Sequence, residues 1–102
     1  MKSTYKLIWS DEALRNLKKI IEYLERRWSE KEVSKFSKLL DNNLELISAK
    51  PLLFPVSQDF PQFRKAVISP QTSIYYEVVN EEIHLITLFD NRQNPNKLKK
   101  LK

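Results

Sequence analysis

Apolar residues in the first half of the chain recur with the period of an amphipathic helix. Between residues 11 and 28 they follow at steps of three or four, which predicts one apolar helix stripe. The stripe consists of Leu14, Leu17, Ile21, Leu24 and Trp28, with Ala13 and Ile20 beside it. Ser10 is a good N-cap for this helix, and Asp11 and Glu12 suit the positive end of its dipole.

A second helix is predicted to start directly after the first. Ser29 and Glu32 have the spacing of a capping box, in which each side chain accepts a backbone N–H. The helix is expected to end before Pro51, because the residue preceding a proline is disfavoured in helical geometry. With almost no linker between them, the two helices are predicted to form an antiparallel hairpin. The apolar positions of the second helix are Val33, Phe36, Leu40, Leu44 and Ile47, with Leu39 and Leu46 at the edge.

Short apolar, β-branched and aromatic runs predict four strands. Residues 5–9 form the first, and residues 63–68, 73–79 and 83–89 form the others. The short polar joins between the last three runs predict two hairpins. The chain contains no glycine, so Asn80 is the expected residue for a left-handed backbone conformation.

The order of elements, β-α-α-β-β-β, predicts an α+β fold. In this fold a helical hairpin packs on one face of a small, mostly antiparallel sheet. Residues 51–62 contain three prolines and are expected to form an irregular connection between the hairpin and the sheet. The chain has 102 residues and is 41% hydrophobic, which is enough for one modest core. We therefore expect a single domain over residues 1–102.

The positive charge is concentrated at the C-terminus. The formal net charge is +5, yet four of the 18 basic residues and none of the 13 acidic ones lie in residues 93–102. The rest of the chain is almost neutral. A solvated terminus explains this basic tail at least as well as a phosphate-binding arm does.

Missing residue types exclude several classes of site. Without cysteine the chain has no disulfide and no thiolate ligand or nucleophile, and without glycine it has no Gly-rich phosphate loop. A zinc site or a Ser/His/Asp triad would depend on His84, the single histidine. We therefore expect no metal and no cofactor. The N-terminus lacks a signal peptide's long apolar region and no run is long enough to span a membrane, so the expected location is the cytoplasm.

Two arginines are candidate functional residues. Arg64 opens the first strand after the irregular connection, and Arg92 lies in the polar segment after the last strand. An arginine beside a rigid sheet is suited to bind a carboxylate or a phosphate. Either arginine could instead brace the sheet, with Asp90 or Glu77 as its acidic partner.

The sheet supplies further candidates. Tyr75 and Tyr76 are expected on opposite faces, one in the core and one on an open face where a ligand could stack. Glu77 shares a face with Tyr75 and could act as a base, or be a solvated strand residue. His84 is out of phase with the apolar positions of its strand, so it is expected at the solvent side or edge, with catalysis as the minority interpretation. Those apolar positions are Ile83, Leu85, Thr87 and Phe89. Trp9 and Trp28 are interpreted as core anchors.

The chain resembles the RelE/ParE superfamily, the small toxins of bacterial type II toxin–antitoxin systems. The resemblance covers roughly residues 5–98 and follows the ParE-like branch at its Arg-x-Asn-Pro ending. The matching residues are Ala13, Leu17, Ile20 and Tyr23 in the first helix, Trp28 at the helix junction, Phe36 and Pro51, Arg64, Ile74-Tyr75-Tyr76, and Arg92-Gln93-Asn94-Pro95.

The resemblance implies a toxin with a cognate antitoxin, forming a toxin–antitoxin hetero-oligomer. Ribonuclease members place a histidine or tyrosine just beyond the last strand, whereas no aromatic residue or histidine follows Phe89 here. This departure favours a ParE-like toxin that arrests growth by binding DNA gyrase.

Two alternatives stay open. The first is a ribosome-dependent mRNA endonuclease, in which Arg64 and Arg92 stabilise charge and Tyr75, Glu77 or His84 carries the proton. The second is a non-toxic adaptor that keeps only the contact with the antitoxin.

Overall fold

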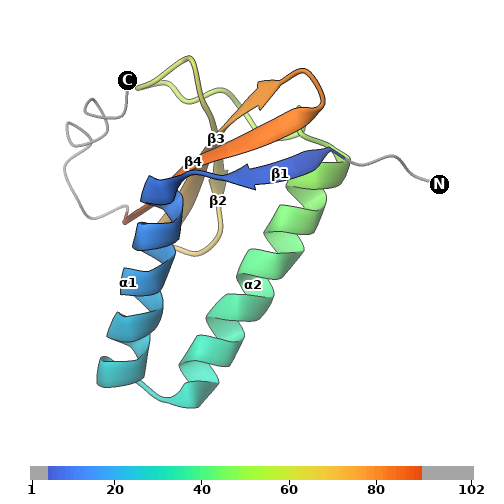
Figure 1. The fold of residues 1–102 in the computed structure, drawn as a ribbon. Helices are drawn as coiled ribbons and strands as arrows, with labels where there is room; N and C mark the ends of the chain where they lie inside the picture. Colours follow the sequence, from blue (N-terminus) through green and yellow to red (C-terminus); the bar gives the residue numbers. More distant parts are fainter. Residues whose placement is uncertain (1–4, 91–102) are drawn as a thin grey trace.

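The computed structural model describes residues 5–90 of the chain. Their order is β-α-α-β-β-β, as the sequence predicts, and the helical hairpin lies against one face of the sheet (Figure 1). The elements are β1 (Lys6–Trp9), α1 (Asp11–Arg27), α2 (Glu30–Ala49), β2 (Arg64–Val67), β3 (Thr72–Val79) and β4 (Glu82–Asp90).

The four strands form one mixed sheet in the order β1-β4-β3-β2. β2, β3 and β4 pair antiparallel through two hairpins, whereas β1 lies parallel to β4 at the edge of the sheet. Asn80, between β3 and β4, has a φ of 57°. This confirms the prediction that an asparagine supplies the left-handed turn.

Ser10 joins the start of α1 to the sheet. Its hydroxyl oxygen accepts the Ala13 N–H at 3.0 Å, which makes it the N-cap, and its hydroxyl donates to the Ile86 carbonyl at 2.8 Å. The predicted cap of the second helix is wrong in its detail. Ser29 is the N-cap of α2, but its side chain makes no capping hydrogen bond, and the Glu32 N–H donates to the Ser29 carbonyl instead.

The main core lies between the helices and the sheet. Leu17, Ile21 and Leu24 of the predicted α1 stripe pack against this core, and Ala13 beside them is fully buried. The two ends of the stripe do not, because Leu14 is 49% exposed and Trp28 is 60% exposed. The expectation that Trp28 is a core anchor is therefore wrong, while Trp9 is half-buried against this core. The buried residues of the core are Ala13, Phe36, Leu40, Ile47, Ala66, Ile68, Ile74, Tyr76, Ile83, Leu85 and Leu88.

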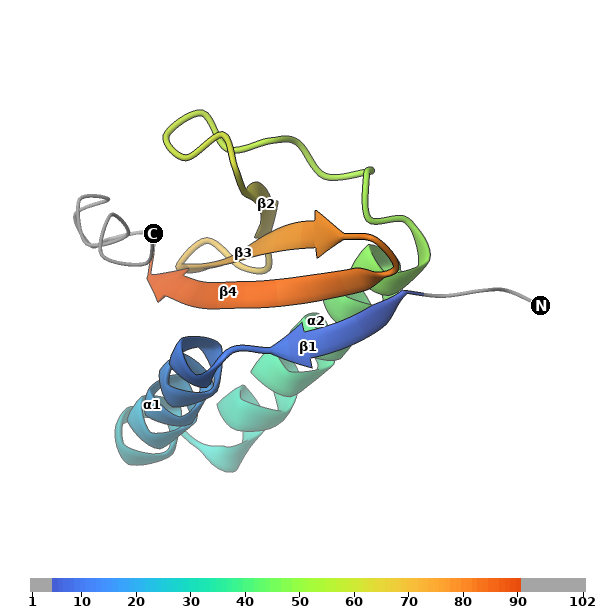
Figure 2. The same ribbon diagram turned by 45° about the horizontal axis from the view of Figure 1, so that its top comes forward.

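A smaller core covers the opposite face of the sheet. It consists of Phe60, Phe63, Tyr75 and Phe89, with Ile86 packed against it. Figure 2 shows how the connection between α2 and β2 runs on the side of the strands away from the helices. Around Tyr75, the second face of the sheet is therefore covered by the connection between α2 and β2.

β4 contains a β-bulge opposite Tyr75 and Tyr76 of β3. Tyr75 pairs with Thr87 but Tyr76 pairs with Leu85, so Ile86 has no register partner on β3. The extra residue changes the alternation of β4. Phe89 therefore joins the smaller core and Leu88 takes its expected place in the main one, which corrects the phase predicted for residues 83–89.

No helix among residues 5–90 is long and apolar enough to cross a membrane.

Candidate functional site

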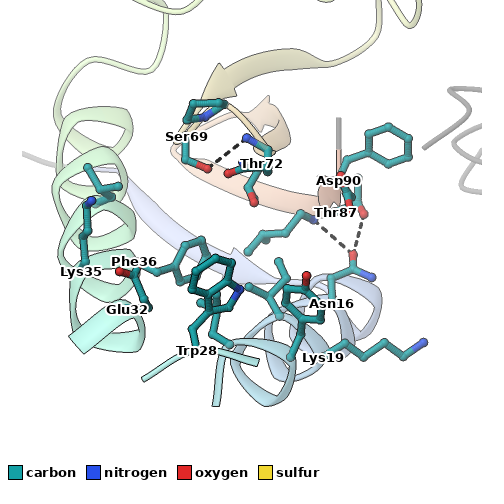
Figure 3. A pocket seen from close by; sticks show the side chains of 18 of the residues that line it. Asn16, Lys19, Trp28, Glu32, Lys35, Phe36, Ser69, Thr72, Thr87 and Asp90 are labelled. Atoms are coloured by element: carbon teal, nitrogen blue, oxygen red, sulfur yellow. Dashed lines mark hydrogen bonds between the residues drawn. The ribbon is translucent and has the colours of Figure 1, made fainter. Parts of the chain in front are cut away.

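A groove of about 680 Å³ runs between the helical hairpin and one end of the sheet. Figure 3 shows its two sides, with the helices opposite the turn that contains Ser69 and Thr72. Its lining is Glu12, Asn16, Lys19, Ile20, Tyr23 and Leu24 of α1, Trp28 at the helix junction, Glu32, Lys35, Phe36 and Leu39 of α2, residues 69–72, and residues 87–90. The groove is large enough for side chains of a binding partner.

The end of the groove at the helix junction is apolar. Trp28 and Tyr23 are exposed there, next to the half-buried Leu24 and the buried Phe36. Arg27 lies with its guanidinium carbon 5.7 Å from the centre of the Tyr23 ring. An exposed tryptophan in a groove is the kind of residue that anchors protein–protein interfaces.

The other end of the groove is polar, and there Asn16 joins α1 to β4 by hydrogen bonds. The Asn16 Oδ1 atom accepts the Thr87 hydroxyl at 2.6 Å and the Leu88 N–H at 3.2 Å. The Asn16 amide donates to Glu12 at 3.0 Å, which orients it so that its oxygen faces β4. This network was not predicted from the sequence. Its only signal was an asparagine inside a helix, where asparagine is a weak helix former.

Glu12 carries a negative charge at this polar end. Hydrogen bonds from the Asn16 amide and the Arg15 guanidinium hold the pKa of the Glu12 carboxyl below its ordinary value. The Arg15 contact is 2.9 Å long and lies at the surface. Glu12 is therefore ionised at neutral pH.

Arg64 binds the irregular connection, residues 51–62, to the start of β2. Its guanidinium donates to the Phe54 carbonyl at 2.6 Å, and Val56 forms an isolated bridge with Arg64. The Lys65 N–H also donates to the Pro55 carbonyl. These contacts give Arg64 a structural partner in a backbone carbonyl, where the sequence suggested an acidic side chain.

The two tyrosines face opposite sides of the sheet, as predicted, but neither lies on an open face. Tyr75 is 2% exposed, and the rings of Phe60 and Phe89 contact it edge-on at 6.4 and 6.1 Å. Burial, with Asp59 nearby, raises the pKa of Tyr75. Tyr76 is fully buried, donates to the Pro51 carbonyl at 2.6 Å, and has its pKa raised to about 12 by burial.

Glu77 and His84 lie opposite each other on β3 and β4. Glu77 also lines a shallow hollow of about 400 Å³ together with Arg64. His84 is half-buried, and its Nε2 atom is 3.0 Å from a Glu82 carboxylate oxygen. The structure thus pairs Glu77 with His84 on adjacent strands, whereas Arg64 pairs with Tyr76 and its guanidinium is bound to the Phe54 carbonyl. Tyr75 lies under its aromatic cover.

Arg92, the remaining candidate, lies outside the described residues, two positions beyond Asp90. Within residues 5–90 there is no cluster of three or more histidine or acidic side chains that could hold a metal ion.

Comparison with known proteins identifies the family. The family model described as the ParE toxin of the type II toxin–antitoxin system parDE matches residues 7–95. The chain belongs to the ParE toxin family. The match extends over both helices and all four strands, so it includes every wall of the groove. No curated protein sequence matched the chain.

Solved structures with the same fold include other toxins. The chromosomal ParDE toxin–antitoxin system from P. aeruginosa gives a TM-score of 0.71 at 16% identity, over 84% of this chain and 95% of that chain. A YoeB/ParE toxin from Agrobacterium tumefaciens gives 0.60 at 13% identity, over 83% and 97%. A copper-bound mutant toxin from Helicobacter pylori gives 0.54 at 18% identity, over 84% and 93%. At these identities the likeness establishes the fold.

Proposed function

We propose that this ParE-family toxin arrests growth by binding DNA gyrase and does not cleave RNA. The observation that carries the proposal is that no histidine or aromatic residue follows Phe89. Metal-free cleavage of RNA by its 2′-hydroxyl needs a base, an acid and cations around the phosphate. The segment after the last strand supplies a cation in Arg92 but no ordinary proton carrier.

The positions of the other candidates support the same proposal. Tyr75 lies under the rings of Phe60 and Phe89, and the Tyr76 hydroxyl is engaged with a backbone carbonyl. Their raised pKa values make both phenols poor bases at neutral pH. Arg64 is engaged with the Phe54 carbonyl. Each of these residues thus has a structural use in holding the sheet together.

The second candidate function is a ribosome-dependent mRNA endonuclease. One observation favours it: Glu77 pairs with His84 on the adjacent strand, and Glu77 and Arg64 both line the shallow hollow. In that mechanism His84 or Glu77 would move the proton, and Arg64 with Arg92 would stabilise the charge on the phosphate. A third candidate, the non-toxic adaptor, would keep the groove but no activity.

The proposed partner is a cognate antitoxin in the cytoplasm. Its segment would bind across the helical hairpin and the end of the sheet, where the apolar and polar parts of the groove lie. Antitoxin segments that fold on binding can cover such a surface and block access to the target. The two proteins would form a hetero-oligomer.

Expression from a tightly controlled promoter separates the three functions. The readouts are growth, the supercoiling of a reporter plasmid, and the length of bulk mRNA. Gyrase binding predicts growth arrest with relaxed plasmid and intact mRNA. Rapid mRNA fragmentation with normal supercoiling would refute it in favour of the endonuclease, and harmless accumulation of folded protein would favour the adaptor.

The antitoxin proposal has its own test. The product of the small reading frame expected beside this gene should bind the purified chain at micromolar concentration or below. A failure to bind at that concentration would contradict it.

A further inference from the structure

The charged side chains of residues 5–90 are divided between two parts of the molecule. The half of the helical hairpin farther from the sheet, residues 15–38, holds eight basic and four acidic residues (Figure 1). The rest of residues 5–90 holds four basic and nine acidic residues. The formal charges of the two parts are therefore +4 and −5. The body of the chain is almost neutral in total but strongly polarised.

Four of the cations form a basic face on the hairpin, turned away from the sheet because the apolar positions of both helices pack toward it. They are Lys18 and Arg26 on α1 and Lys31 and Lys38 on α2. All four are exposed, and none of them lines the groove. Glu22 lies four residues from both Lys18 and Arg26, yet within residues 5–90 no ion pair involves any of the four cations. Their charges are therefore available to a partner.

The composition of this surface favours a nucleic acid over a protein as the partner. Within residues 15–38 the exposed large hydrophobic residues are Tyr23 and Trp28, and both line the groove. The basic face thus offers no apolar anchor, whereas protein interfaces have an apolar core that is depleted in lysine. Protein–DNA interfaces are polar and positively charged, and their lysines and arginines bind the phosphates. The face also has no aromatic side chain on which an unpaired base could stack, so a duplex suits it better than a single strand.

We infer that the basic face binds the phosphate backbone of duplex DNA without reading its sequence. Lys18 and Arg26 are roughly 12 Å apart along α1, at about 1.5 Å per residue, and Lys31 and Lys38 are roughly 10 Å apart along α2. A duplex carries one phosphate charge per about 1.7 Å of its axis, so several phosphates lie within reach of the four cations. The choice of DNA over RNA rests on the proposed function, because gyrase holds duplex DNA. In that complex the basic face would add contacts with the DNA to those with the enzyme.

Fluorescence anisotropy of the purified chain with a labelled DNA duplex of about 20 base pairs, at salt concentrations of about 50–200 mM, tests the basic face. Lys31→Gln/Lys38→Gln removes two of its charges, and glutamine is a good helix former. The affinity should fall about tenfold or more at about 100 mM salt. The slope of the logarithm of the binding constant against that of the salt concentration should fall in magnitude by about 2, because each lost phosphate contact removes about 0.9.

A second double variant is the matched control for charge. Lys6→Gln/Lys50→Gln removes two exposed lysines that lie outside residues 15–38, so the net charge changes equally. It should leave both the affinity for the duplex and the salt slope nearly unchanged. Thermal melting of both double variants checks that they remain folded.

Four results would overturn the inference. The first is that the purified chain does not bind the DNA duplex at about 50 mM salt. If the two double variants lose affinity equally, net charge and not the basic face is responsible. If Lys99→Gln/Lys100→Gln loses affinity and Lys31→Gln/Lys38→Gln does not, the duplex binds the basic tail. If duplex RNA or polyglutamate binds as tightly as the DNA or more tightly, the face is not a DNA site.

The inference and the proposed function can fail separately. The anisotropy assay contains no gyrase, so an absence of DNA binding leaves the inhibition of purified gyrase to be measured in its own reaction. Conversely, a toxin that binds the duplex through the basic face but leaves gyrase active would refute the proposed function alone.

Discussion

Removing one buried hydroxyl from Tyr76 should destabilise the protein without touching its function. Tyr76 is fully buried and donates to the Pro51 carbonyl at 2.6 Å. Its ring contacts Phe54 edge-on, with centroids 6.4 Å apart, and Phe in place of Tyr would keep that contact. Tyr76→Phe therefore isolates the hydrogen bond. The bond joins the centre of the sheet to the end of α2.

The magnitude follows from the unpaired carbonyl that the substitution leaves. A buried acceptor without its donor costs about 1–3 kcal/mol. A loss of about 2 kcal/mol lowers the melting temperature of a domain of this size by roughly 8–16 °C. Toxicity per folded molecule should be unchanged, because the hydroxyl lies inside the core.

The pH dependence gives a second signature. Burial raises the pKa of Tyr76 from 10.0 to about 12, so the folded protein keeps the proton that the unfolded chain releases. The stabilising contribution is full below pH 10 and is lost as the pH rises through about 12. Two pH units correspond to about 2–3 kcal/mol. The wild type should therefore lose the contribution of Tyr76 to the free energy of unfolding between pH 10 and about pH 12, and Tyr76→Phe should show no such loss.

Urea unfolding at pH 8 and at steps through pH 12 measures both effects. Tyr23→Phe is the control, because Tyr23 is 40% exposed and should change stability by less than about 0.5 kcal/mol. Equal stability of Tyr76→Phe and the wild type at pH 8 would refute the structural role of the hydroxyl. A stability difference that stays constant from pH 8 to pH 12 would refute the account of its pKa.

Five further substitutions, at four positions, separate structural from functional side chains. Ser10→Ala should lower the free energy of unfolding by about 1–2 kcal/mol because it removes a helix cap. Ser29→Ala should lower it by less than about 0.5 kcal/mol because the Ser29 side chain makes no capping hydrogen bond. Urea titrations of both variants measure these losses, and equal losses would contradict the prediction. Arg64→Ala should lower the free energy of unfolding by about 1–3 kcal/mol with toxicity falling only in proportion to the folded fraction; toxicity lost at full stability would place Arg64 in a nuclease site. Arg92→Ala should change the melting temperature little and abolish growth arrest in a plating assay. Arg92→Lys should also be impaired in growth arrest, because lysine cannot make a bidentate contact. An Arg92→Ala variant that remains fully toxic would show that this arginine is not needed for toxicity.

The order of elements was predictable because local signals agree with one another. The helix cap at Ser10, the proline at residue 51 and the turn at Asn80 are each set by their own side chains and backbone preferences. Hydrophobic periodicity also identified Phe36, Leu40 and Ile47 as core residues. The resemblance to known toxins added the family, which the match over residues 7–95 establishes.

The groove was less predictable because it depends on tertiary contacts. Periodicity places Trp28 on an apolar stripe, but it contains no information about whether another element covers that end of the helix. The bulge opposite Tyr75 and Tyr76 changes the phase of β4 by one residue, and no residue type marks it. The Asn16 network joins residues 71 and 72 positions apart. Pairings of this kind arise only when the sheet docks on α1.

The central proposal is that the toxin acts by binding gyrase, and an assay of purified components tests it most directly. Purified gyrase with relaxed plasmid and ATP should lose supercoiling activity as the wild-type protein is titrated in. Arg92→Ala at the same concentrations should leave the activity intact, and the antitoxin should restore it in the wild-type reaction. Full supercoiling in the presence of folded wild-type protein that still arrests growth in cells would contradict the proposal.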